Sequence, residues 1–118
     1  MARILVIDDE AEARDAVAEV LSQASHEVLT AEHGGAGVDL YQRHGADLVI
    51  TDMLMPEKDG LETIREVIRM DPAAKIIAVS GAGALLLSMA GGLGAQRTLM
   101  KPFTPADLLR AVGEMLAA

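Results

Sequence analysis

The sequence predicts an α/β fold: an open, five-stranded parallel β-sheet that carries helices on both faces. Short apolar runs rich in Ile, Val and Leu alternate with segments of helical periodicity along all 118 residues. Several of these runs are continuous rather than alternating in polarity, as in strands that are buried on both faces. Five strand–helix units suit one core in a chain of this length. We therefore expect a single domain over residues 1–118.

Each expected strand is a short apolar run. In chain order, the runs are 4–7, 27–31, 47–51, 75–80 and 97–100. Between and after them, apolar residues recur on one face at helical spacing. The apolar residues that mark these helices lie within 13–24, at 38 and 41, and within 61–68; the fourth helix is expected over 84–90, and the fifth from 105 with its apolar residues up to 116.

Glycine and proline positions set several of the expected helix ends. Glycines within 34–37 weaken the second helix, and Gly91-Gly92 is expected to end the fourth. The fifth helix is expected to begin at Thr104-Pro105, a capping residue followed by proline at the first helical position. Its periodicity predicts that both Leu108 and Leu109 are buried.

Composition and charge exclude several classes of protein. The net charge of −8 disfavours direct binding to nucleic acid or to an anionic membrane. The absence of Cys excludes disulfides and thiolate metal sites. The longest apolar stretch, 81–95, is too short to span a bilayer, and the N-terminus lacks the pattern of a signal peptide. We expect a soluble, cytoplasmic protein whose acidic residues either aid solubility or hold a cation.

Charged and hydroxyl side chains stand where four of the strands end. They are Asp8, Asp9 and Glu10 after the first strand, Asp52 after the third, Ser80 on the fourth and Lys101 after the fifth. Functional sites of open parallel sheets lie beyond these carboxyl ends. Clustered carboxylates need a compensating cation, and Mg²⁺ is the natural ion for oxygen ligands. A phosphoryl group would suit the metal, the ammonium and the hydroxyl together, with an Asp carboxylate as its nucleophile.

Four segments, VIDDE, LVITDMLMPEKDG, IIAVSG and TLMKPF, together resemble the receiver domain of bacterial two-component response regulators. The resemblance covers the whole chain. It implies a flavodoxin-like, doubly wound (βα)5 fold with strand order 2-1-3-4-5. It also implies a phosphoacceptor that is not an enzyme in the ordinary sense, because it catalyses only its own phosphorylation and dephosphorylation.

The resemblance assigns roles to the acidic residues. Asp52 would accept a phosphoryl group from a sensor histidine kinase or a phosphotransfer protein. Asp9, Asp52 and the backbone carbonyl of Leu54 would bind Mg²⁺ directly, and Asp8 would act through water. Glu10 matches a frequent third acid, although a first-turn helix acid favoured by the helix dipole explains it equally well.

The resemblance also assigns roles outside the acidic cluster. Ser80 would hydrogen-bond a phosphoryl oxygen after activation, and Lys101 would pair first with Asp52 and then with the phosphate. The Lys101–Pro102 peptide would be cis, which requires proline. Pro56 and Gly60 match the turn that follows the phosphorylated strand.

Three positions depart from the family pattern. Thr98 stands where an aromatic residue usually rotates inward on activation, so the relay from Ser80 must use other groups. Leu54 and Ala82 are apolar where family members often carry polar residues that orient a hydrolytic water. These two residues predict slow loss of the phosphoryl group.

The fourth helical segment is unusually rich in large apolar residues. Leu86, Leu87 and Met89 lie too close together for one face to bury all of them. One interpretation is ordinary packing with a stray exposed leucine. The other is a surface for a downstream effector or a homodimer, formed by the fourth helix, the fifth strand and the fifth helix.

Three classes of function are compared. The favoured one is a phosphoacceptor that shifts between two arrangements and thereby switches partner binding. A receiver that only binds partners is disfavoured by the complete set Asp8, Asp9, Asp52, Ser80 and Lys101. A Mg²⁺-dependent phosphatase or phosphotransferase of the haloacid-dehalogenase type is disfavoured because Leu54 stands where its general acid would be. The cognate kinase, the output and whether the chain is a piece of a larger regulator stay open.

Overall fold

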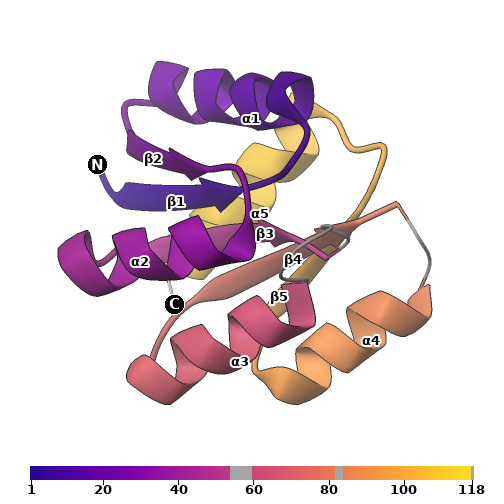
Figure 1. Ribbon diagram of the computed structural model, residues 1–118. Coiled ribbons are helices and arrows are strands. Elements are labelled where there is room, and N and C mark those ends of the chain that lie inside the picture. Colours follow the sequence, from indigo (N-terminus) through magenta and orange to yellow (C-terminus); the bar gives the residue numbers. More distant parts are fainter. Residues whose placement is uncertain (54–59, 82–83, 118) are drawn as a thin grey trace.

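The computed structural model describes residues 1–53, 60–81 and 84–117, and for residues 84–87 the backbone alone. Strands and helices alternate along these residues (Figure 1). The strands are β1 Arg3–Ile7, β2 Glu27–Ala31, β3 Leu48–Asp52, β4 Ile76–Ser80 and β5 Arg97–Met100. The helices are α1 Ala11–Gln23, α2 Gly34–His44, α3 Gly60–Met70, α4 Ala84–Leu93 and α5 Pro105–Ala117. None of the described helices has the length and apolarity needed to cross a bilayer.

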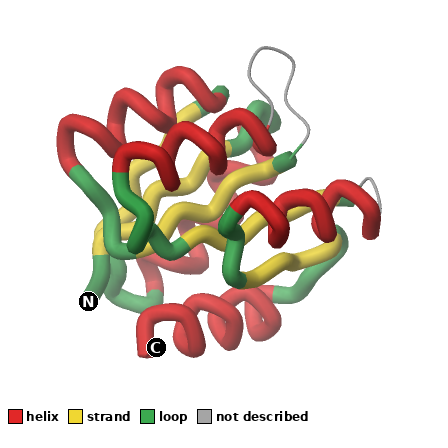
Figure 2. The backbone as a smooth tube through the Cα atoms, turned by 90° about the horizontal axis from the view of Figure 1, so that it is seen from below, coloured by secondary structure: helices red, strands yellow, loops and turns green. Residues whose placement is uncertain are grey.

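The strands form one parallel sheet in the order β2-β1-β3-β4-β5, which confirms the expected fold and strand order. Helices cover both faces of this sheet (Figure 2). One core cluster joins the sheet to α2, α3 and α4, and the other joins it to α1 and α5. β1 contributes to both clusters, because Leu5 and Ile7 face one and Ile4 and Val6 face the other.

Two sequence expectations about the helices were wrong. α4 continues through Gly91-Gly92 to Leu93, and the chain leaves the helix at Gly94, which has a φ of +126°. Leu109 is 38% exposed, whereas Leu108 is buried. The buried face of α5 consists of Leu108, Ala111, Val112 and Met115, at helical spacing. Leu109 lies about 100° further round the helix and falls outside that face.

Two glycines bring helices close to the strands that carry the site. A Cβ at Gly37 would overlap the side chain of Ile7, so glycine lets α2 lie directly on the end of β1. A Cβ at Gly60 would lie 2.6 Å from the main-chain oxygen of Asp52 and from Cα of Met53. The first residue of α3 therefore packs against the end of β3.

The start of α5 follows the sequence prediction. Thr104 Oγ1 accepts a hydrogen bond from the main-chain N–H of Asp107 at 3.0 Å, and Asp107 Oδ2 accepts one from the N–H of Thr104 at 3.1 Å. This reciprocal cap satisfies two helix-start donors. Hydrogen bonds from the main-chain N–H and from the side chain of Thr104 to the Asp107 carboxyl group lower the pKa of Asp107. The cap fixes the end of the loop that carries Lys101.

Candidate functional site

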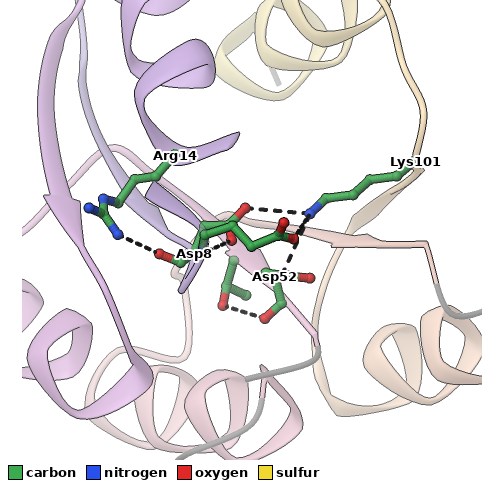
Figure 3. Close-up of polar contacts among 6 residues, drawn as sticks. Asp8, Arg14, Asp52 and Lys101 are labelled. Atoms are coloured by element: carbon green, nitrogen blue, oxygen red, sulfur yellow. Dashed lines mark hydrogen bonds and ion pairs between the residues drawn. The ribbon is translucent and has the colours of Figure 1, made fainter. Parts of the chain in front are cut away.

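The site lies at the carboxyl ends of β1, β3 and β4 and in the loop after β5. Asp8 directly follows β1, and Asp52 is the last residue of β3; each is only 6% exposed. Buried carboxylates need a nearby positive charge or hydrogen-bond donors. Figure 3 shows both carboxylates beside the side chain of Lys101.

Lys101 is the positive charge at the centre of the cluster. Its Nζ lies 3.5 Å from Asp8 Oδ2, 3.6 Å from Asp52 Oδ2 and 3.9 Å from Glu10 Oε1. Burial alone would lower the pKa of Lys101, but the negative charges of Asp52, Asp8 and Glu10 together outweigh it and raise that pKa above its ordinary value. Lys101 therefore stays protonated at neutral pH.

Asp8 is held by three hydrogen bonds as well as by Lys101. Its main-chain N–H donates to Ala31 O at 3.1 Å, which continues the ladder between β1 and β2. Its Oδ1 accepts from the N–H of Glu10 at 2.9 Å, and its main-chain oxygen accepts from Arg14 Nη1 at 3.0 Å. The turn from β1 into α1 is thus ordered around Asp8.

Three carboxylates are arranged so that they can share a cation. One oxygen from each of Asp8, Glu10 and Asp52 lies within 4.8 Å of the others. The donors are all carboxylate oxygens, the ligand type that Mg²⁺ prefers, and the negative charge exceeds what Lys101 alone compensates. The group does not include Asp9, which is described and whose side chain is exposed. The direct metal contact expected of Asp9 stays a prediction, and Leu54, Pro56 and Ala82 lie outside the described residues.

Ser80 ends β4 and is 1% exposed. Its main-chain oxygen accepts a hydrogen bond from the N–H of Lys101 at 2.9 Å, so the two residues are fixed side by side. β4 pairs with β3, which carries Asp52. The Lys101–Pro102 peptide is cis, which confirms that prediction.

Thr98 and Met89, named for switching and for partner binding, lie outside the acidic cluster. Thr98 is exposed on the edge strand β5, in register with Ala78 of β4. Met89 and Met100 are about half exposed. A pocket between α4 and β5 is lined by Ser88, Gly91, Ala95, Gln96, Arg97, Thr98 and Met100. The side chains of Leu86 and Leu87 lie outside the described residues, so the partner face stays a prediction.

The sequence analysis missed two features of the site. One is Arg14, and helix geometry could have indicated it: side chains lean toward the N-terminus of a helix, so one in the first turn of α1 can reach back to the end of β1. The other is an apolar pocket of about 480 Å³ beside the carboxylates, whose lining includes Ala13, Val17 and Phe103. It depends on how α1 and the loop after β5 meet, which local patterns do not specify.

Known proteins provide an independent comparison. Residues 4–113 match the family model described as the response regulator receiver domain. The chain is 35% identical to chemotaxis protein CheY of Bacillus subtilis, with 97% of each chain covered. It is 33% identical to chemotaxis protein CheY of Thermotoga maritima, with 96% of each covered. A crystal structure of a receiver domain protein from Clostridium thermocellum superposes with a TM-score of 0.93 at 34% identity, covering 99% of this chain and 95% of that one.

Proposed function

We propose, because the chain belongs to the family of response regulator receiver domains, that residues 1–118 act as one phosphoacceptor domain of a two-component phosphorelay. Asp52 would receive the phosphoryl group from a histidine kinase or a phosphotransfer protein. The observation that carries this proposal is the placement of Asp52 at a strand end, beside Asp8 and a protonated Lys101. The chain would catalyse only its own phosphorylation and dephosphorylation.

The chemistry is a displacement at phosphorus. A carboxylate oxygen of Asp52 attacks the phosphoryl group of the donor while the bond from phosphorus to the donor's imidazole nitrogen breaks. The electron pair of that bond goes to the leaving nitrogen, and the product is an acyl phosphate on Asp52. Lys101, 3.6 Å from Asp52, provides a positive charge for the oxygens of the transferred group.

Asp8, Glu10 and Asp52 are the described residues that would hold the metal, with Asp9 and the carbonyl of Leu54 as further expected ligands. Mg²⁺, when bound there, supplies charge neutralisation for the phosphoryl oxygens. Asp8 would keep its orientation through its bonds to Glu10 and Ala31. The protein's own part is therefore to align the carboxylates and to keep the nucleophile beside the cationic groups.

Phosphorylation would act by shifting a population of two arrangements. The added charge at Asp52 would draw in Ser80 and Lys101, which are joined by a main-chain hydrogen bond. That movement would reach α4 and β5 through residues at the end of β4. Since Thr98 is exposed and short, the aromatic switch cannot operate in its usual form, and the α4–β5 face would bind an effector or a second copy.

Intact-mass measurement tests this proposal. The protein is incubated with acetyl phosphate or phosphoramidate, with and without Mg²⁺, alongside Asp52→Ala and the control Asp39→Asn, an exposed acid on α2. One Mg²⁺-dependent phosphoryl adduct is expected in the wild type and the control and none in Asp52→Ala. No adduct under any condition would favour a receiver that only binds partners.

A further inference from the structure

Arg14 contacts the acidic pocket through the main chain. Its Nη1 donates to the main-chain oxygen of Asp8 at 3.0 Å. Arg14 lies in the first turn of α1, and its partly buried side chain extends back toward the end of β1 (Figure 3). The bond ties the start of the helix to the residue that follows the strand.

The oxygen that Arg14 holds lies beyond the sheet. The register of β1 and β3 ends at Ile7 and Thr51, one residue before Asp8. A buried main-chain oxygen needs a donor, and the Arg14 side chain provides one where the ladder stops. Because Asp8 Oδ1 in turn accepts from the N–H of Glu10, the same turn also holds the main chain from which the Glu10 side chain extends to the cluster.

The two cations around Asp8 have different partners. Lys101 contacts the carboxylates of Asp8 and Asp52. Among the described residues, the Arg14 side chain donates its hydrogen bond to the main-chain oxygen of Asp8. They approach Asp8 from opposite sides (Figure 3). Loss of Arg14 would thus remove neither a carboxylate nor Lys101 from the cluster, but it would release the turn that aligns the carboxylates.

We propose that Arg14 is a positioning residue of the metal pocket: by holding the main-chain oxygen of Asp8, it aligns the Asp8 and Glu10 carboxylates and so strengthens Mg²⁺ binding. This inference rests on the proposed function. It also predicts the sign of the effect. The positive charge of Arg14 by itself repels a metal ion. If Arg14 acted only through this charge, its removal would tighten Mg²⁺ binding. If Arg14 holds the turn in place, its removal weakens Mg²⁺ binding.

Calorimetric titration with Mg²⁺ separates these two effects. Arg14→Gln is compared with Arg14→Lys, which keeps the charge and one donor group, and with Arg43→Gln, which removes an equal charge from the exposed face of α2. Arg14→Gln is expected to weaken Mg²⁺ binding about tenfold, the lower end of the range for groups that orient metal ligands. Arg14→Lys should recover part of the loss, and Arg43→Gln should bind as the wild type does. At saturating Mg²⁺ the phosphorylation rate of Arg14→Gln should return to that of the wild type.

Amide hydrogen exchange in metal-free protein gives a second readout. The N–H of Glu10 should exchange faster in Arg14→Gln than in wild type or Arg43→Gln, because its acceptor on Asp8 is less fixed. Wild-type affinity or tighter binding in Arg14→Gln would overturn this inference alone. A variant that does not fold would also overturn it, since Arg14 would then support the fold and not the pocket. A wild type that binds no Mg²⁺ would overturn the proposed function, and this inference with it.

Discussion

The ammonium of Lys101 lies 3.6 Å from the carboxylate of Asp52, although β5 and β3 are not neighbours in the sheet. β4 separates them, and the contact forms only because Lys101 extends from the loop after β5 over the end of β4. The same ammonium also approaches Asp8 from β1. One side chain therefore connects three strand ends and places a positive charge beside two buried carboxylates.

Lys101→Met is expected to destabilise the metal-free protein. Two buried carboxylates would lose their compensating charge, at a cost of roughly 1–3 kcal/mol, less than for a fully buried pair because Lys101 is partly exposed. Mg²⁺ should restore more stability to this variant than to the wild type, since the two cations neutralise the same carboxylates. Urea unfolding with and without Mg²⁺ measures both effects. Equal stability of the two metal-free proteins would contradict the role given to Lys101.

Tyr41 on α2 predicts a specific loss of stability at high pH. Its hydroxyl donates to Asp71 Oδ2 at 2.8 Å, after the end of α3. Burial, that hydrogen bond and the charge of Asp71 raise the pKa of Tyr41 to about 12. Because the pKa of Tyr41 is higher in the folded than in the unfolded protein, the neutral phenol stabilises the fold. This stabilisation is fully present below the unfolded-state pKa, near 10, and is lost as the pH rises from 10 to about 12.

Comparison with Tyr41→Phe isolates this effect. The variant should lose about 1 kcal/mol at neutral pH through the missing hydrogen bond. Its stability should then fall less than that of the wild type as the pH rises from 10 to about 12, because the variant has no phenol to ionise. Tyr41 is the only tyrosine of the chain, so absorbance reports its ionisation directly. Parallel stability curves for both proteins would show that the pKa is not raised.

Two glycine-to-alanine changes should act in opposite directions. Gly37→Ala places a methyl group against Ile7 and should cost roughly 1–3 kcal/mol by overpacking. Gly92→Ala, on α4 with no atom of the described residues within 4 Å of its Cβ, should stabilise by about 0.5–1 kcal/mol. Thermal unfolding of the two variants provides the measurement. A stabilised Gly37→Ala variant would argue against the close packing of α2 on β1.

Loss of the phosphoryl group is expected to be slow. Leu54 and Ala82 are apolar where a polar side chain would orient the hydrolytic water, so a half-life of minutes or more is predicted from the sequence. Leu54→Asn should shorten it, and decay can be followed by intact mass after the donor is removed. A half-life of seconds in the wild type with Mg²⁺ would contradict this prediction.

The strands and most of the site followed from local signals in the sequence, whereas the strand order was implied by the resemblance to receiver domains. Continuous apolar runs identify strands, and the polar residue that ends each run identifies the site edge, so Asp52, Ser80 and Lys101 could be named. Helix capping could be read as well, because Thr104 and Pro105 define the start of α5 locally.

The remaining features depend on packing. Helical periodicity alone does not show which of Leu108 and Leu109 is buried, because that depends on where the sheet lies relative to α5. Of three consecutive acids, Asp8 and Glu10 lie with Asp52, and Asp9 is exposed, which depends on how the turn is folded. The end of α4 was missed because its final turn contains the two glycines, whose cost in an exposed helix is about 1 kcal/mol each, small enough for the fold to tolerate.

The location of the phosphoryl group is the most direct test of the central claim. The protein is phosphorylated with acetyl phosphate and Mg²⁺, and the acyl phosphate is reduced with borohydride, which converts the modified aspartate to homoserine. Peptide mass spectrometry then locates the conversion. The account predicts homoserine at position 52 and unmodified Asp8 and Asp9. Conversion at another acid, or a stable adduct that borohydride does not reduce, would contradict it.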